Sequence, residues 1–131
     1  MLADVWKSIM NAHGYLNFTW CDDILTVEAF GPFNNEGAVK AAQDYINAVA
    51  HKSTEKFVVL EVLDENSLGA PETMKEVVKL WYYLAEQGCV ALALVFSNNI
   101  QHSLAEKGLP NFGKTFSNLE QAKAWLAQVE R

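Results

Sequence analysis

The stretch that decides the fold runs from Phe57 to Gly88 and reads FVVLEVLDENSLGAPETMKEVVKLWYYLAEQG. Its first part, Phe57–Leu63, is apolar at every position except Glu61, which is typical of a strand covered on both faces. An acidic loop follows, and Pro71 opens a helix that ends at Gly88. We therefore expect a central strand, a loop and a crossover helix. The core positions expected in that helix are Met74, Val77, Val78, Trp81, Leu84 and Ala85.

A β-hairpin is expected before this stretch. Residues 15–20 alternate apolar and polar side chains, Asp22 and Asp23 supply a turn, and residues 24–30 form the return strand. The first dozen residues carry apolar side chains at helical spacing and predict a short amphipathic helix, which could pack on its own domain or on a second copy.

Helices and strands alternate through the rest of the chain. A helix capped by Asn34 or Asn35 is expected after Pro32, with an inward stripe of Val39, Ala42, Ile46 and Val49, and with Ala38, Ala41 and Tyr45 beside it. Beyond Gly88 the sequence predicts strands at 90–96 and 111–116, a helix at 100–107 and a last helix with the capping box Ser117-x-x-Glu120. Strands separated by helices predict an α/β fold with a mixed sheet, since the hairpin adds an antiparallel pair.

Size and charge limit the classes of function. A chain of 131 residues, half of them hydrophobic, is long enough for one core and short for two domains, so we expect a single domain over 1–131. Sixteen acidic residues against 10 basic ones give a net charge of -6, and Arg131 is the only arginine. Nucleic acids and anionic membrane surfaces are therefore unfavourable partners.

Two cysteines, Cys21 and Cys89, lack the close spacing of a zinc or redox motif and are expected to be reduced thiols in a cytosolic core. The longest apolar run, Cys89–Phe96, is far shorter than the roughly 20 residues that span a bilayer. The amino terminus has no continuous hydrophobic segment like that of a signal peptide. We therefore expect a cytoplasmic protein without membrane insertion.

The chain resembles the STAS domain, the fold of bacterial anti-sigma-factor antagonists, and more closely the SpoIIAA-like group of small bacterial proteins related in fold to CRAL-TRIO domains. The matching features are Gly31–Asn34, Ala70–Glu72, Trp81, Gly88 and Ala122–Leu126. The resemblance implies a five-stranded mixed sheet flanked by helices, and a non-enzymatic regulatory module that binds protein. The alternative that it leaves open is a small apolar-ligand or lipid-binding domain of CRAL-TRIO-like character.

In STAS regulators, the loop after the central strand carries an Asp-Ser-Ser/Thr-Gly run whose hydroxyl is phosphorylated. Here the corresponding place reads Gly69, Ala70, Pro71 and Glu72, so the acceptor is missing. A phosphate on Ser67 would also lie among acidic side chains. The regulatory loop that the resemblance indicates comprises Asp64, Glu65, Asn66, Ser67 and Thr73.

No arrangement of residues in the sequence predicts catalysis, a metal or a cofactor. Glu61, Asp64 and Glu65 could act as acid and base or hold a cation, but neighbours on an extended chain point apart, and a solvated loop is the simpler interpretation. Ser67 lacks the Gly-x-Ser-x-Gly elbow, and Cys89 begins a buried strand. The three histidines, His13, His51 and His102, are far apart in the sequence.

Two groups of aromatic residues are candidates for binding. Tyr83 falls in the polar arc of the middle helix, with Leu80 and Tyr82 at its borders, and predicts a surface for a partner or for a homodimer. Trp20, Phe33, Phe112 and Phe116 lie in or beside turns and could line an apolar pocket, although such residues more often close the ends of a core.

Overall fold

The computed structural model of the protein describes residues 11–67 and 71–131. Its elements are β1 (Tyr15–Cys21), β2 (Ile24–Phe30), α2 (Asn35–Ala50), β3 (Phe57–Leu63), α3 (Pro71–Glu86), β4 (Cys89–Val95), α4 (Asn99–Gly108), β5 (Gly113–Phe116) and α5 (Leu119–Gln128). The amino-terminal helix expected from the sequence falls largely outside the described residues. No helix in residues 11–67 or 71–131 is long and apolar enough to cross a membrane.

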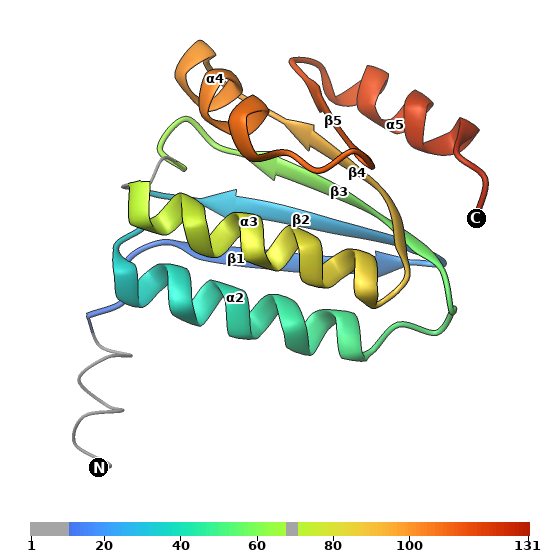
Figure 1. Ribbon diagram of the computed structural model, residues 1–131, viewed down its shortest axis with the longest axis horizontal. Helices are drawn as coiled ribbons and strands as arrows, with labels where there is room; N and C mark the ends of the chain where they lie inside the picture. Colours follow the sequence, from blue (N-terminus) through green and yellow to red (C-terminus); the bar gives the residue numbers. More distant parts are fainter. Residues whose placement is uncertain (1–10, 68–70) are drawn as a thin grey trace.

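The strands form one mixed sheet in the order β1-β2-β3-β4-β5, with β3 in the middle (Figure 1). The hairpin strands β1 and β2 pair antiparallel, and β2, β3, β4 and β5 pair parallel to their neighbours. Helical crossovers between parallel neighbours account for this order. The predicted fold class and the central place of Phe57–Leu63 are therefore confirmed.

The two faces of the sheet have separate cores. Phe57 and Val59 of β3 pack with residues of α2, α3 and α4 on one face, where Tyr45 and Trp81 are the largest buried side chains. On the other face, Val58 and Leu60 pack against α5. Each of these four β3 side chains is at most 3% exposed, and full burial of such a side chain stabilises the fold by roughly 1.5–3 kcal/mol. Both faces of β3 are therefore covered, as its composition predicts.

The helices α2 and α3 lie side by side over one face and both begin at the edge where β2 and β3 end (Figure 1). Asn34 caps α2 by accepting a hydrogen bond from the N–H of Gly37 at 2.8 Å. The α3 helix is followed by Gly88, whose φ of +107° suits glycine, and a Cβ there would lie 2.1 Å from the carbonyl oxygen of Glu55. These two helix ends agree with the sequence analysis.

The inward stripe of α2 was predicted with the wrong phase. Val39 and Ile46 are 51% and 39% exposed, and the buried side of the helix carries Ala38, Ala41, Tyr45 and Val49. Small alanines allow α2 to approach the sheet closely, and Tyr45 then reaches across to β3. Two adjacent stripes of α2 are apolar, and the contact with the sheet decides which of them is buried. Hydrophobic periodicity alone carries no information about that contact.

Three smaller expectations were also wrong. Ala85 of α3 is exposed, and its neighbour Leu84 is buried. Asn118, rather than Ser117, caps α5 by accepting from the N–H of Gln121 at 3.0 Å. Cys21 is exposed at the end of β1, so only Cys89 is a core thiol. Both cysteines are free, as expected.

Candidate functional site: the loop after β3 and the cavity beside it

The loop that follows β3 is held to the hairpin by Asp64. Its Oδ1 accepts hydrogen bonds from the N–H of Gly31 and the N–H of Asn66, each at 3.1 Å. The backbones meet so closely that a Cβ on Gly31 would lie 2.0 Å from the carbonyl oxygen of Asn66. Glycine at position 31 is thus required by the contact between hairpin and loop, and the start of the loop is a fixed structure.

Ser67 uses its hydroxyl within this structure. Its Oγ lies 2.8 Å from the carbonyl oxygen of Ala29 and 2.5 Å from Oδ1 of Asp64, and its N–H donates to the carbonyl oxygen of Asp64. A phosphate on this oxygen would remove the donated hydrogen and place its charge against the carboxylate. The side chain of Thr73, and the helix start at Ala70, lie outside the described residues.

Residues after β4 hold the loop from the other side. Gln101 is 2% exposed; its Nε2 donates to the carbonyl oxygen of Asp64 at 2.6 Å, and its Oε1 accepts from the N–H of Ser97 at 2.7 Å. The hydroxyl of Ser97 donates to the carbonyl oxygen of Leu63 at 2.6 Å. The carboxyl ends of β2, β3 and β4 are therefore joined, and Glu65 and Asn66 project from a supported loop into solvent.

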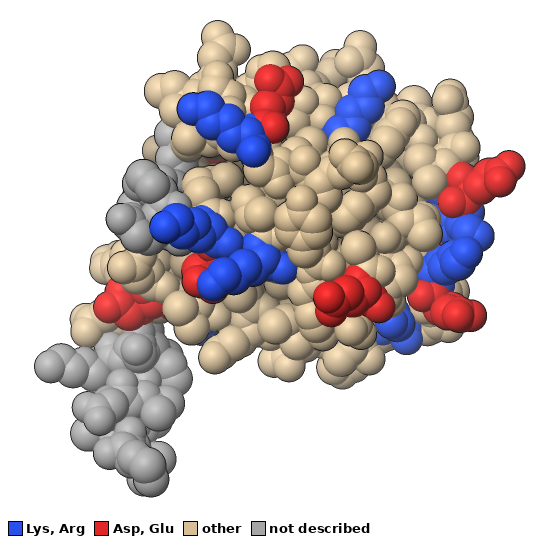
Figure 2. Space-filling view, viewed as in Figure 1, with Lys and Arg blue, Asp and Glu red and all other residues tan. Residues whose placement is uncertain are grey.

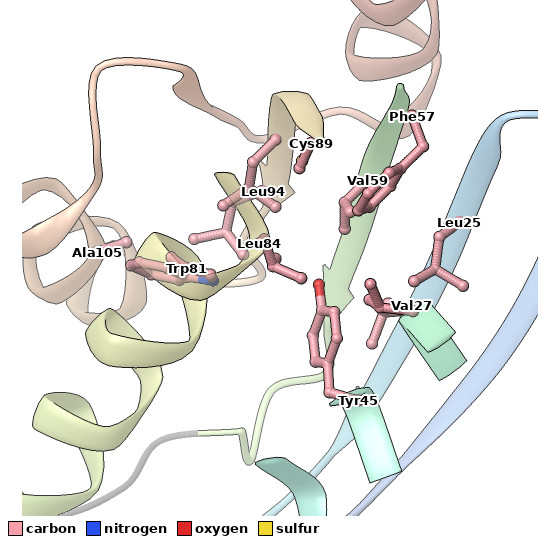
Figure 3. Packing of buried hydrophobic residues seen from close by; sticks show 12 residues of the cluster. Leu25, Val27, Tyr45, Phe57, Val59, Trp81, Leu84, Cys89, Leu94 and Ala105 are labelled. Carbon is pink, nitrogen blue, oxygen red and sulfur yellow. The ribbon is translucent and has the colours of Figure 1, made fainter. Parts of the chain in front are cut away.

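An apolar cavity of about 100 Å³ lies beside this loop, between the sheet and the helices α2, α3 and α4. Ser67 and Phe33 line it, together with alanines of α2 and Leu80 of α3. Figure 3 shows the hydroxyl of Tyr45 and the ring nitrogen of Trp81 pointing into the space between the helices and β3. The cavity therefore combines apolar walls with a few buried polar groups.

The polar groups of the cavity centre on Glu61, which is 7% exposed. The hydroxyl of Tyr45 donates to Glu61 Oε1 at 3.0 Å. Burial raises the pKa of Glu61 from 4.5 to about 7, although the donors of Tyr45 and Trp81 oppose this shift. Burial also raises the pKa of Tyr45 well above its usual value, and the charge of Glu61 adds to this effect.

The indole N–H of Trp81 is directed at the Glu61 carboxyl group. Trp81 is 2% exposed, and its N–H favours the charged form of Glu61. Among the described residues, its Nε1 is the only buried side-chain nitrogen or oxygen that lacks a hydrogen bond of good geometry. Since buried polar groups are nearly always hydrogen-bonded, Glu61 is the acceptor that this donor uses, at a less favourable geometry.

The aromatic residues predicted to form an apolar pocket do not gather at one place. Phe33 lines the cavity, but Trp20 packs edge-on against Phe57 with its Nε1 bonded to the carbonyl oxygen of Ala48 at 2.9 Å. Phe116 belongs to the core on the opposite face of the sheet, and Phe112 packs at the edge of the other core. Three of the four residues therefore pack at the ends of a core. This is the other interpretation that the sequence left open for these aromatic residues.

The residues predicted to form an interface lie on different sides of α3. Tyr82 is 57% exposed and follows Val78, which faces α4, by one helical turn. Leu80 shares the cavity wall with Ala42 of α2, and the half-buried Tyr83 follows it by three residues on the same side. Leu80 and Tyr83 therefore border α2, and Tyr82 points away from it.

Two residues of α2 complete this border. Val39 and Ile46 lie three residues before and four residues after Ala42, so they share the side of α2 that meets α3. We call Val39, Ile46, Leu80 and Tyr83 the α2–α3 seam. Residues other than Lys, Arg, Asp and Glu make up most of this face of the molecule, and the charged side chains lie in small groups on it (Figure 2).

Sequence reasoning missed the importance of Glu61. It grouped Glu61 with the carboxylates of a solvated loop, but the structure buries this side chain. A signal was present, since Glu61 is the one charged residue in an otherwise apolar strand. Tyr45 and Gln101 gave no comparable signal, because a single polar residue on a helix is ordinary. Among residues 11–67 and 71–131, no cluster of three His, Cys, Asp or Glu side chains could hold a metal.

Neither a protein-family model nor a curated protein matches the chain in sequence. Solved structures do match it. The NMR structure of the protein TM1081 is 16% identical with a TM-score of 0.65, and the match covers 86% of this chain and 88% of that one. An anti-sigma factor antagonist from Mycobacterium paratuberculosis is 13% identical with a TM-score of 0.65, over 88% of this chain and 95% of that one.

A third match is an uncharacterised protein of the DUF3478 family with a SpoIIAA-like fold, from Shewanella loihica. It is 18% identical with a TM-score of 0.59, and the match covers 88% of this chain and 94% of that one. At identities this low, the structural similarity establishes the fold alone. The chain therefore has the SpoIIAA-like fold that its sequence resembles.

Proposed function

We propose that this protein is a non-enzymatic regulatory module that binds another protein through the loop after β3 and the α2–α3 seam. The fold shared with an anti-sigma factor antagonist over 88% of the chain carries the proposal. The α2 and α3 helices both begin at the edge of the sheet where the loop lies, so the loop is next to the helix starts from which the seam runs (Figure 1).

The chemistry of this surface favours a protein partner. Val39 and Ile46 expose apolar side chains beside the half-buried Tyr83, and aromatic and aliphatic side chains at such positions bury area at low entropic cost. The loop adds the exposed carboxylate of Glu65, and the whole chain carries a charge of -6. We therefore expect a partner surface with an apolar centre and basic residues around it.

Phosphorylation of Ser67 is not part of this proposal. The hydroxyl already bonds to Ala29 and Asp64, and its removal should leave the backbone contacts of the loop in place. A Ser67→Ala variant is accordingly expected to bind the partner as the natural protein does.

Capture from the cell that makes the protein tests the partner and the surface together. We expect one protein to be captured in stoichiometric amount by the natural chain, and about tenfold less by Ile46→Lys, which places a positive charge in the seam. Gln121→Lys, on the exposed side of α5 and across the sheet, is the matched control and should capture the normal amount. Absence of any captured protein would reject the function, and full capture by Ile46→Lys would reject the seam.

A homodimer through Tyr83 is the second use of this surface that we propose, since identical apolar patches are self-complementary about a two-fold axis. Light scattering of the natural chain should give twice the monomer mass, and the Tyr83→Glu variant should have the mass of a monomer. Gln121→Glu adds the same charge on the opposite face and should keep the dimer mass. An equal mass for the natural chain and Tyr83→Glu would remove Tyr83 from the interface.

A further inference from the structure

An open groove with a volume of about 640 Å³ lies between α3 and α4. Its floor is apolar and comprises Met74 and Val78 of α3 together with Leu104 and Gly108 of α4. The two residues from each helix are four positions apart, so they lie on the side of that helix that faces the groove. The α3 and α4 helices therefore form the two walls of an apolar channel on the surface, which we call the α3–α4 groove.

Gly108 brings the two helices into contact at the floor of the groove. A Cβ at this position would lie 2.5 Å from Cγ2 of Val78, so a larger residue would displace that side chain. The floor residues are half-buried, which means that they pack against the protein and still present apolar surface to solvent. Packing between the helices thus forms the groove before any partner binds, and a partner would not have to order it.

Three lysines surround this apolar floor. Lys75 and Lys79 lie one turn apart on α3, Lys107 lies on α4, and all three are exposed. Lysine side chains over both helices are visible in Figure 2. These are three of the 10 basic residues in a chain of net charge -6, and no described acidic residue lines the groove. The groove is therefore a local region of positive charge on an acidic protein.

Two acidic side chains close to these lysines in the sequence do not compete strongly for them. Glu76 pairs with Lys79 at 3.4 Å, and an exposed pair of this kind contributes little to stability. Glu106 directly precedes Lys107, but its carboxylate contacts Nε2 of His102 at 2.7 Å. Carboxylates of a partner can therefore bind the lysines without breaking a buried ion pair.

An acidic amphipathic helix has the shape and charge that this groove requires. A channel between two helices accommodates a third one, whose apolar side chains at every third or fourth position reach the floor. Aspartate or glutamate on both sides of that apolar stripe would then meet lysines on both walls.

Nucleic acids and membranes match the groove less well. Phosphates of a nucleic acid would contact three lysines and leave the apolar floor unused. A membrane surface contacts side chains that protrude, whereas this floor lies between two helices, and the net charge of -6 opposes approach to anionic lipids.

We propose that the α3–α4 groove is a docking site for an acidic amphipathic helix of another protein. The groove and the α2–α3 seam lie on different sides of α3, because Val78 contacts α4 whereas Leu80 shares a cavity wall with α2. The docking site therefore does not rest on the proposed binding through the loop and the seam.

Synthetic peptides of about 18 residues test the groove directly, since this length allows a helix to form. The probe has leucine at every third or fourth position and glutamate on both sides of the leucine stripe. We expect it to bind saturably, measured by fluorescence anisotropy of the labelled peptide. A peptide with lysine in place of each glutamate, and one with alanine in place of each leucine, should each bind at least about tenfold more weakly.

Charge reversal on each wall locates the bound peptide. Lys79→Glu on α3 and Lys107→Glu on α4 should each weaken binding of the acidic peptide about tenfold. Lys123→Glu makes the same change on the exposed side of α5, across the sheet, and should leave the affinity unchanged. The peptide should also shift the methyl NMR signals of Val78 and Leu104 in the natural chain, because its leucines reach the floor.

Three results would overturn the proposal. The first is the absence of saturable binding by the acidic peptide, including the case where the natural chain binds phosphatidylglycerol vesicles instead and Lys79→Glu does not. The second is equal affinity for the acidic and the basic peptide, and the third is normal binding by both Lys79→Glu and Lys107→Glu. The seam variant Ile46→Lys should bind the acidic peptide as the natural chain does, so failure here and failure of the proposed function are distinguishable.

Discussion

At the scale of single residues, Glu61 combines a central position with an unfavourable environment. It lies in the middle strand, bonded to Tyr45 and facing Trp81, and burial raises its pKa to about 7. Leucine or valine at this place would pack without that cost. The donors of Tyr45 and Trp81 are directed at this carboxyl group, so they offset part of the free-energy cost of burying it.

The titration of Glu61 predicts a pH dependence of stability. Between pH 4.5 and about 7 the folded chain keeps a proton on Glu61 that the unfolded chain has released, so the free energy of unfolding falls as the pH rises through this range. The loss attributable to Glu61 should approach about 3 kcal/mol and level off above pH 7. Below pH 4.5 the contribution of Glu61 is fully present.

Urea denaturation at several pH values measures this effect. Glu61→Gln keeps an acceptor for Tyr45 and removes the charge, so it should equal the natural chain near pH 4.5 and exceed its stability at pH 8. Glu65→Gln, on the exposed part of the loop, is the control and should follow the natural chain at both. Parallel pH profiles for the natural chain and Glu61→Gln would show that Glu61 is not the group responsible.

At the scale of elements, the sequence predicts where a helix or strand occurs better than it predicts which face of the helix is buried and at which residue it ends. The strands Ile24–Phe30 and Phe57–Leu63 were expected with these bounds, because uniform or alternating apolar patterns are local properties. The face of α2 was misjudged, since Val39 and Ile46 are as apolar as the buried Ala41. Because α2 packs closely against the sheet, its alanines are on the buried side, and the larger Val39 and Ile46 side chains lie in the seam.

The start of α5 offers a prediction at this scale. Asn118 rather than Ser117 bonds to the first turn, so Asn118→Ala should lower the free energy of unfolding by about 1 kcal/mol, measured by urea denaturation. Ser117→Ala should change it by less than about 0.5 kcal/mol, because the side chain is exposed. If Ser117→Ala lowered the free energy of unfolding more than Asn118→Ala does, the capping box predicted from the sequence would be correct after all.

At the scale of the whole molecule, the sheet separates two cores that share the central strand. Phe57 and Val59 serve one core, Val58 and Leu60 the other, so loss of either core uncovers β3. Unfolding is therefore expected to be a single cooperative event, as is usual for domains of this size.

The two cysteines report on that cooperativity. Cys21 is exposed, whereas Cys89 is 5% exposed and burial raises the pKa of its thiol to about 12. A thiol reagent should therefore label Cys21 rapidly and Cys89 at the rate of global opening. In a Cys21→Ser variant, labelling of Cys89 should accelerate with urea in parallel with unfolding followed by tryptophan fluorescence. Labelling of Cys89 that is fast and independent of urea would indicate local opening at β4.

The loop after β3 shows where sequence-based prediction of the site ends. Its acidic residues and missing phosphoacceptor are visible in the sequence, and its place at the carboxyl edge of the sheet follows from the fold. The partners of Asp64 and Ser67, however, come from the end of β2, from Gly31 directly after it and from α4. Contacts between residues 33 to 38 positions apart cannot be read from local patterns, so the hydrogen-bonded structure of the loop was not predictable.

The amino-acid sequence by itself determined the order of helices and strands, the central place of Phe57–Leu63 and an α/β fold with a mixed sheet. These depend on apolar periodicity and on turn and cap residues, which act over a few neighbouring positions, whereas the SpoIIAA-like type of fold was indicated by family resemblance. Tertiary structure alone decided that Tyr45, Glu61 and Trp81 meet around a cavity and that Val39 and Ile46 face solvent. Such outcomes depend on how closely separate elements pack, and packing is a property of the assembled molecule.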